Sequence, residues 1–522
     1  MRPVPPQDWV SGLKENFRYD ILSGFIIFLI ALPLCLGIAL ASGAPAIAGV
    51  IAGVVAGTVA NLLSGSYVTI NGPAAGMIVI VLGAVTELGF EGALAVGVVA
   101  GGIQILLGLA KAGVLTGFFP LSVVHGMLAG IGLIIMSGQI HIVVGHENPR
   151  AHGLHIFTEI PPSVLDPVPA TALVGVAAIA VMVLWPLLGK IGVLVPAPLV
   201  AVLVGTGIAL VNGAGPRLSL GGGLLDGLQA PDFSVLTSVP AIKWVILYVF
   251  VASLESLLTA EAVDKLDPWK RRSNMNRELV GKGAGNMVSS AIGGLPMIAE
   301  VVRSKANIIS GARTRWSNFF HGTFLFVFVL AIPTVLEQIP LAALAGILMV
   351  VGFKLAHPKD FKHALDVGKV DFVLMTVTAL TVLLTDLLIG VATGIVLGVL
   401  HALVRRVRPG NLLKPRMEVR HEGDRVHVAF TGALGFHNFI PVRSLLDGMP
   451  RGKQVTFDFS GVHYIDPTVL ERLHDFEVDY SYDGGVVERV GVGHLKPDGD
   501  HRFSTRVASA SASPSLSAPR GS

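Results

Sequence analysis

The chain contains few charged residues. Of its 522 residues, 14% are Asp, Glu, Lys or Arg and 52% are hydrophobic, whereas soluble globular proteins carry about 25% charged residues. This shortage excludes an ordinary soluble protein of this length. It predicts an all-α polytopic membrane protein, because a bilayer favours apolar helices whose backbone groups are satisfied internally.

Cysteine and nucleotide-binding motifs are equally scarce. Cys35 is the only cysteine, which excludes an intramolecular disulfide, and its apolar surroundings indicate a small buried side chain. The glycine-rich stretch 221–227 (GGGLLDG) lacks the Lys-Ser/Thr pair of a phosphate-binding loop. We therefore expect neither an enzyme nor a cofactor. The basic residues lie in short loops and do not predict a nucleic-acid partner.

Apolar runs of about 15 to 22 residues dominate the chain up to residue 407 and predict about 14 membrane-spanning segments. The seven predicted for the first half, about 20–213, are 20–41, 44–63, 73–88, 92–111, 119–145, 169–189 and 196–213. The seven predicted for the second half, about 241–407, are 241–262, 275–292, 297–309, 316–335, 340–356, 370–386 and 388–407.

The distribution of Lys and Arg supports this topology, because these residues accumulate in cytoplasmic loops. With the N-terminal segment 1–19 in the cytoplasm, the basic clusters at 265–277 and 405–408 fall on the cytoplasmic side. The loops predicted to lie outside, 146–168 and 214–240, carry few basic residues. We therefore expect a multi-pass protein of the inner (cytoplasmic) cell membrane with both termini in the cytoplasm.

The two halves correspond weakly in sequence. Asn61 of VANLLSG aligns with Asn286 of AGNMVSS, and Pro73 of GPAAGMIV aligns with Pro296 of LPMIAEVV. Matching motifs in the same order predict an internal repeat. Because each half has an odd number of crossings, the second copy enters from the opposite side of the membrane. The repeats are therefore predicted to be inverted.

Each half also contains a strand-like approach, a proline and a short apolar helix. Pro73 and Pro296 begin these helices, so two helix N-termini are predicted to point at each other near the middle of the membrane. Such termini present unpaired N–H groups and positive partial charge. The alternative, two ordinary proline kinks, does not explain their matching positions. The pattern predicts a site for an anion.

Ionisable residues inside predicted spans are the best candidates for chemistry, because a bilayer makes isolated charges costly. Glu255 lies opposite the repeat position of Pro33, with Thr259 one turn later; Glu300 and Arg303 lie in the second short helix. We expect Glu255 to bind a coupling proton or cation. A purely structural alternative is a buried Glu300–Arg303 pair. Two ionised carboxylates would repel a bound anion, so at least one is expected to hold a proton or a cation during transport. The sequence therefore predicts symport and does not distinguish Na⁺ from H⁺ as the coupling ion.

Two further regions lie outside this pattern. Residues 409–500 alternate apolar and polar residues and predict a small cytoplasmic α/β domain, and 501–522, rich in Ser, Ala and Pro, predict a disordered tail.

His141, His146, His152 and His155 gather around one outer loop with Glu147. Their irregular spacing fits no metal-ligand template, so we do not predict a metal site.

Four motifs resemble the SulP family of inorganic anion transporters: SGSYVTINGPAAGM, SLESLLTAEAVD, SNMNRELVGKGAGNMVSSAIGGLPM and VRSKANIISGARTR. The terminal domain resembles the STAS domain that follows the SulP membrane region, although Pro467 stands at its phosphorylatable position. The resemblance implies inverted seven-helix repeats, core and gate domains, elevator-like movement and often a homodimer. It is also compatible with a cytoplasmic partner that binds the STAS-like domain.

The family resemblance also implies site residues. By resemblance, the anion would be held at Ala74, Ala75, Gly76, Ile298, Ala299 and Glu300, and the coupling cation at Glu255 and Thr259. The residues themselves add Pro73 and Arg303 to the expected anion site and Glu300 to the expected cation site. We expect bicarbonate as the substrate, because GLPMIAEVVRS resembles the branch associated with carbonic anhydrases and a singly charged anion suits two carboxylates. Sulfate uptake, proton-coupled nucleobase uptake, an anion channel and a membrane-anchored regulator remain as alternatives.

Overall fold

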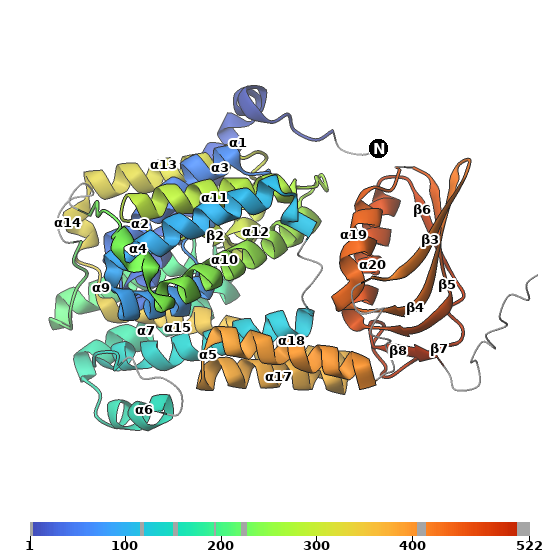
Figure 1. Ribbon diagram of the computed structural model, residues 1–522. Helices are drawn as coiled ribbons and strands as arrows, with labels where there is room; N and C mark the ends of the chain where they lie inside the picture. The colour runs from blue at the N-terminus through green and yellow to red at the C-terminus, as the bar shows by residue number, and fades with distance from the viewer. Residues whose placement is uncertain are drawn as a thin grey trace, which may run out of the picture. The chain divides into compact units, whose positions relative to one another are not determined.

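The computed structural model describes residues 4–114, 120–149, 155–189, 191–192, 195–220, 227–404, 414–450 and 452–508 (Figure 1). The chain divides into two compact units. The first comprises 1–113, 128–356 and 383–387, and the second comprises 114–127, 357–382 and 388–522. The first is helical apart from two very short strands, whereas the second contains helices and a larger β-sheet.

The first unit is built from helices of very different length, from the 3 residues of α3 to the 33 residues of α1. They are α1 (Trp9–Ala41), α2 (Ala46–Val55), α3 (Asn61–Leu63), α4 (Ile78–Leu109), α5 (Leu121–Val144), which begins in the second unit, α6 (His155–Leu165), α7 (Pro169–Leu184), α9 (Ala197–Asn212), α10 (Val239–Leu266), α11 (Met275–Ala291), α12 (Val301–Ile309), α13 (Trp316–Ala331), α14 (Pro333–Leu336) and α15 (Leu341–Leu355).

Eight helical stretches in the described part of the whole chain are long and apolar enough to cross a membrane, and α9 and α13 are shorter apolar helices. The polytopic helical fold is therefore confirmed. Every predicted segment coincides with helical residues, while the count of 14 crossings stays a prediction. The predicted boundary between 73–88 and 92–111 falls inside α4, where Gly89 leaves the helical conformation with φ 75°. The helix α6 was not predicted.

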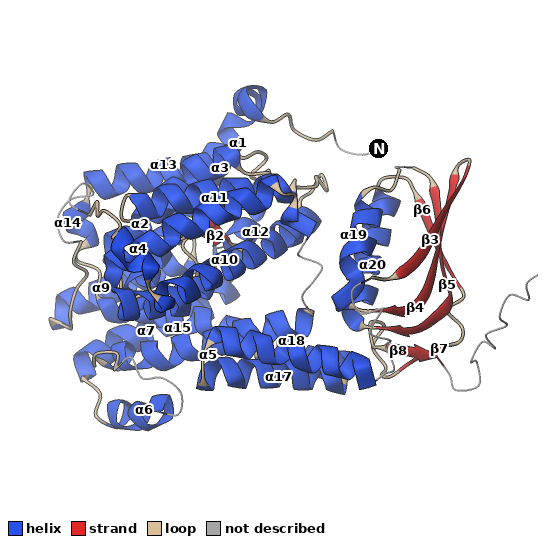
Figure 2. Cartoon of the chain, viewed as in Figure 1, coloured by secondary structure: helices blue, strands red, loops and turns tan. Residues whose placement is uncertain are grey.

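The two predicted helix breaks lie together. After α3 the chain runs through β1 (Asn71–Gly72), which pairs antiparallel with β2 (Ile298–Ala299), Asn71 lying opposite Ala299 and Gly72 opposite Ile298. Figure 2 shows β2 among the helices of this unit. A short 3₁₀ turn, Ala75–Met77, and α4 follow β1, and α12 follows β2. The prediction that two interrupted helices meet is confirmed.

The second half-helix begins later than the sequence predicts. Pro296 lies before β2, and α12 starts at Val301 with Glu300 as its N-cap. The predicted start at 297 is wrong, because residues 298–299 are held extended by their pairing with β1. Glu300 therefore precedes the helix, and Arg303 lies in its first turn.

The second unit combines three further apolar or amphipathic helices with a sheet. The helices are α16 (Pro358–Val367), which was not predicted, α17 (Lys369–Leu384) and α18 (Leu387–Val404). The strands are β3 (Arg416–Glu422), β4 (Arg425–Leu434), β5 (Gln454–Ile465), β6 (Val486–Val490), β7 (Leu495–Pro497) and β8 (Arg506–Ala508). They run in the order β3-β4-β5-β8-β7, and β6 also pairs with β5.

Two helices, α19 (Phe439–Asp447) and α20 (Pro467–Tyr482), cover one face of this sheet (Figure 2). Alternate residues of β4 and β5, such as Phe430 and Phe457, pack with Leu473 of α20 in a buried core. The predicted α/β domain is therefore present. The predicted start of the tail at 501 is wrong, since β8 pairs with β5 and β7; residues 509–522 lie outside the described residues.

Glycines allow α4 and α11 to approach at backbone distance. A Cβ atom at Gly101 would lie 2.5 Å from the backbone N of Met287 and 2.6 Å from the carbonyl O of Gly283. A Cβ atom at Gly102, the next residue of α4, would meet nothing within 4 Å. Between helices in lipid there is little hydrophobic driving force, so association depends on close van der Waals packing. Small residues at the contact allow the two backbones to approach closely enough for this packing.

We expect Gly101→Ala to lower the melting temperature of the purified protein, because α11 backbone atoms cannot move aside and overpacking costs about 1–3 kcal/mol. Gly102→Ala is the matched control and is expected to leave the melting temperature unchanged or to raise it. Thermal unfolding in detergent measures both. Equal melting temperatures for the two variants would contradict this account of the α4–α11 contact.

Candidate functional site

The candidate site lies where the two half-helices begin. Ala74 caps the first with extended backbone, φ −125° and ψ 150°, and Glu300 caps the second in a similar conformation. Ala74, Ala75, Ile298 and Ala299 are all buried. The first N–H groups of any helix lack an intrahelical acceptor and carry positive partial charge. The pairing of β1 with β2 brings two such ends into one buried region.

Arg303 crosses from the second half-helix to the first. Its guanidinium is fully buried and donates from Nη2 to the carbonyl O of Pro73 at 2.9 Å. A Cβ atom at Gly72 would collide with Nη1 of the same guanidinium. The glycine therefore makes room for the arginine, and Arg303 ties the start of the first half-helix to α12.

Glu300 compensates this buried charge. One carboxylate oxygen of Glu300 lies 3.1 Å from Nε of Arg303, three residues later in α12. The backbone N–H of Glu300 also donates to the carbonyl O of Ile70 at 2.9 Å. The structural alternative considered for these two residues, a buried ion pair, is what the geometry shows. Arg303 and Glu300 together add little net charge to the site.

Glu255 differs from Glu300. A Cβ atom at Gly76 would overlap its carboxylate, so this side chain lies against the first turn of the first half-helix. Its Oε2 atom is buried and has no hydrogen-bond partner in the described part of the chain. Thr259 is buried one helical turn later, on the same face of α10. Glu255 is thus the carboxylate available for a proton or a cation.

Two polar residues at this position were missed by the sequence analysis. Ser256 is fully buried, and its hydroxyl accepts the backbone N–H of Ala299 at 3.3 Å. Both side-chain polar atoms of Asn71 are buried without a hydrogen-bond partner within the described ranges. Buried polar atoms are normally satisfied, so Asn71 and Glu255 offer free polar atoms to a bound solute. The sequence feature that could have identified Asn71 is its polar side chain in an apolar stretch, two residues before Pro73.

A second layer of polar residues supports β2. The Asn286 side chain accepts the backbone N–H of Met297 at 2.6 Å and donates to Gln104 at 2.7 Å. Gln104 in turn donates to the hydroxyl of Ser253 at 3.1 Å. This chain of hydrogen bonds joins α11, α4 and α10 and fixes the approach to the second half-helix. The repeat comparison singled out Asn286, but it did not predict these partners.

The histidines of the loop that is predicted to lie outside make local contacts. The Nδ1 atom of His141 lies 2.7 Å from the hydroxyl of Ser163, and Nε2 of His146 lies 2.6 Å from the carbonyl O of Asp166. His152 lies outside the described residues. Among the residues that the structure describes, no three or more His, Cys, Asp or Glu are grouped to hold a metal ion.

The model of the sulfate permease family matches residues 17–378 of the chain. The chain belongs to the sulfate permease family. It is 29% identical over 472 residues to the putative sulfate transporter YvdB of Bacillus subtilis, covering 87% of each chain. It is 28% identical over 397 residues to the bicarbonate transporter BicA of a Picosynechococcus species, covering 73% of this chain and 69% of that protein.

Solved structures agree with this assignment. The transmembrane domain of a cyanobacterial bicarbonate transporter BicA superposes with a TM-score of 0.63 and 26% identity, covering 73% of this chain and 97% of that one. The structure of SLC26A9 superposes with a TM-score of 0.68 at 17% identity, covering 92% of this chain and 85% of that one, which shows a shared fold. The chain is therefore a membrane anion transporter of this family and not an enzyme, and its C-terminal sheet domain is consistent with a STAS domain.

We expect Gly76→Ala to reduce anion uptake at least about tenfold while the protein still folds. The new methyl group would displace only the flexible end of the Glu255 side chain, which can move without backbone rearrangement. Uptake per folded transporter in proteoliposomes, with the melting temperature as a check of folding, measures the effect. Full uptake by a Gly76→Ala variant would contradict the placement of Glu255 in the site.

Proposed function

We propose that the chain takes up bicarbonate by symport with Na⁺ or H⁺. The observation that carries this proposal is the unpaired Glu255 carboxylate beside the start of the first half-helix. The helix ends supply positive partial charge for the anion, and Glu255 supplies a negative charge that a cation or proton neutralises. Cotransport follows, because the anion and an ionised Glu255 repel each other unless the coupling ion is present.

The charge balance favours a singly charged solute. Since Arg303 is paired with Glu300 at 3.1 Å, its positive charge is already compensated, and the remaining attraction comes from two helix N-termini. Each terminus is equivalent to about half an elementary charge. Two termini therefore match one negative charge better than two. Pro73, Ala74, Ala75 and Gly76 would hold the anion on one side, and Ile298, Ala299 and Glu300 on the other.

The coupling ion would lie between α10 and the first half-helix. A carboxylate of Glu255 with the hydroxyl of Thr259 and nearby carbonyl groups provides the oxygen ligands that Na⁺ requires, and Glu255 by itself suffices for a proton. Glu300 is a weaker candidate ligand for the coupling ion than the sequence indicates, because one of its carboxylate oxygens is paired with Arg303. We infer that Glu255 is the principal coupling residue.

Sulfate is the second candidate substrate. The proteins named as sulfate transporters include YvdB, which is similar over most of the chain, while BicA proteins of two cyanobacteria support bicarbonate.

Alternating access is proposed to occur by elevator-like movement of a core domain against a gate domain, within a homodimer in the inner membrane. The STAS-like domain would bind a cytoplasmic partner or stabilise the dimer.

Uptake into proteoliposomes tests this function directly. Labelled bicarbonate, sulfate and uracil are offered separately, each with an inward Na⁺ gradient, an inward H⁺ gradient or neither. We expect bicarbonate to accumulate only when one cation gradient is present. Accumulation of sulfate alone would move the chain to the second candidate, uracil uptake would indicate nucleobase transport, and gradient-independent current would indicate a channel.

We expect Glu255→Gln to abolish concentrative uptake while downhill exchange of the anion persists, because the amide keeps the size of the side chain but cannot ionise. Glu87→Gln is the matched control. Glu87 pairs with Lys243 at a position where both side chains are partly exposed, and such pairs contribute little. Unchanged gradient-driven uptake by Glu255→Gln would exclude Glu255 as the coupling residue.

A further inference from the structure

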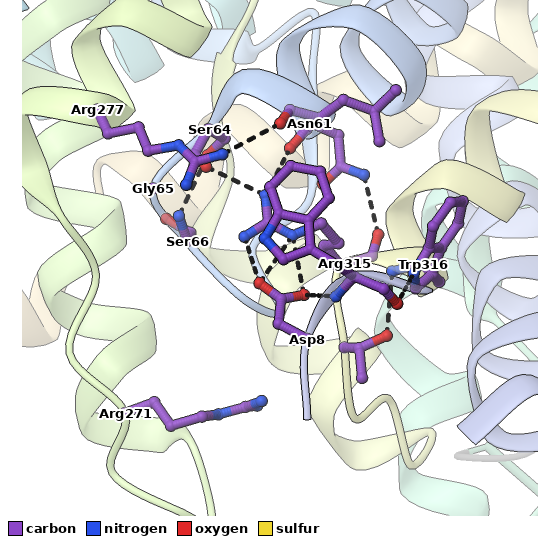
Figure 3. A network of polar contacts seen from close by, with 12 residues as sticks. Asp8, Asn61, Ser64, Gly65, Ser66, Arg271, Arg277, Arg315 and Trp316 are labelled. Carbon is purple, nitrogen blue, oxygen red and sulfur yellow. Dashed lines mark hydrogen bonds and ion pairs between the residues drawn. The ribbon is translucent and has the colours of Figure 1, made fainter. Parts of the chain in front are cut away.

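The start of α1 is fastened to the loop that leads from α3 toward β1 (Figure 3). The carboxylate of Asp8 accepts hydrogen bonds from Nε of Arg315 at 3.0 Å and from Nη2 at 2.6 Å. Nη1 of Arg315 donates to the carbonyl oxygens of Asn61 at 3.2 Å and Ser64 at 3.1 Å. One buried guanidinium thus joins the N-terminal segment to the carbonyl end of α3, an arrangement in which Arg forms strong charge-assisted hydrogen bonds.

Trp9 adds to this attachment. Its ring lies under two guanidinium groups, with Cζ of Arg315 at 4.5 Å and Cζ of Arg277 at 5.2 Å from the ring centroid. Its carbonyl O accepts the indole N–H of Trp316 at 2.8 Å. Trp9 has φ 59°, in the left-handed region, which is strained for a residue with a side chain. The surrounding contacts hold the residue in this conformation.

The N-terminal segment is held by these polar contacts and not by burial of apolar surface. Trp9 is 43% exposed and Val4 is 88% exposed. Residues 4–7, together with Trp269 and Arg313, line an open pocket of about 400 Å³. A segment attached through charge and without a packed core can separate and return while the helices behind it stay folded.

The same loop is also hydrogen-bonded to α11. The Glu278 carboxylate accepts the backbone N–H of Gly65 at 3.1 Å and the hydroxyl of Ser66 at 2.8 Å, and also the hydroxyl of Ser64. Lys282 pairs with Glu278 at 2.5 Å, and both side chains are fully buried. Breaking such a buried pair is costly. The Asp8–Arg315 pair is less buried, with the Asp8 side chain 17% exposed, so it is the more accessible of the two attachments.

Between this loop and the proposed anion site, α12 side chains hydrogen-bond to the chain at three positions. Asn307 donates to the carbonyl O of Val68 at 2.9 Å, and the hydroxyl of Ser304 accepts the N–H of Ile70 at 2.9 Å. The last contact in the series is the Arg303–Pro73 hydrogen bond at the start of the first half-helix. Arg315 at Asn61 and Ser64, and the α12 residues at Val68, Ile70 and Pro73, therefore contact the same continuous segment.

We propose that Asp8 and Arg315 are positioning residues for anion transport: docking of the N-terminal segment through their ion pair holds residues 61–73 so that the first half-helix faces the anion. This inference rests on the proposed location of the anion site. It assigns a role to the SGARTR motif, whose last residue is Arg315, and to the segment before the first predicted span.

Transport kinetics provide the first test. We expect Asp8→Asn to raise the KM for bicarbonate at least about fivefold, a coupling typical of linked sites, while the maximal rate per folded transporter changes less than about twofold. Asp8→Glu, which keeps the carboxylate, should restore most of the affinity. Glu15→Gln removes the same charge from an exposed position of α1 and should leave KM unchanged.

Labelling of Cys35 provides a second test that needs no substrate. Cys35 is the only cysteine, is fully buried, and its Sγ lies 4.0 Å from Nη1 of Arg303. Loosening of the segment 61–73 should expose it, so a small methanethiosulfonate reagent should react at least about fivefold faster with Asp8→Asn than with Glu15→Gln. Gly101→Ala controls for general destabilisation and should react more slowly than Asp8→Asn.

The two tests separate this inference from the proposed function. If the wild-type protein transports none of the offered solutes, the proposed function fails and the Cys35 rates alone decide. Raised KM together with faster labelling supports the inference. It is overturned by an unchanged KM, by Asp8→Asn and Glu15→Gln reacting equally with the reagent, or by a loss of maximal rate alone, which a merely structural role produces.

Discussion

The antiparallel pairing of β1 with β2 is the contact on which the rest of the structure depends. It joins two chain segments that are more than 200 residues apart, and it does so with backbone hydrogen bonds inside a region where unpaired backbone groups are costly. Each strand ends where a helix begins, so the pairing fixes two helix N-termini beside each other. The position of Arg303 against Pro73 and of Glu255 against Gly76 follows from this arrangement.

The charges around this contact are distributed unequally between the two halves. Glu255, Glu300 and Arg303 all come from the second half, whereas the first half contributes small residues such as Gly72 and Gly76 that make room for them. Pairing of Arg303 with Glu300 leaves Glu255 as the carboxylate without a compensating partner among the described residues. In the proposed function, the helix ends bind the anion and Glu255 is the acidic side chain that binds the coupling ion.

Much of this architecture was predictable, because hydrophobic length and repeated motifs are local properties. The helices α9, α11 and α15 begin and end within about two residues of the predicted segments, which is as precise as helix boundaries can be. The start of α12, the helices α6 and α16, and the strand β8 were not predicted correctly. In α12 and β8 the error has a common cause, since pairing with a distant strand decides their conformation.

By itself, the sequence determined the membrane class, the broken helices and the terminal α/β domain, because each is encoded in composition or in periodicity over a short window. Only the tertiary structure decided which charges compensate each other, that Asn71 and Ser256 lie at the candidate site, and that Asp8 is bonded to Arg315. These facts depend on side chains brought together from distant parts of the chain. No local pattern specifies such partners, since many alternative pairings are compatible with the same apolar helices.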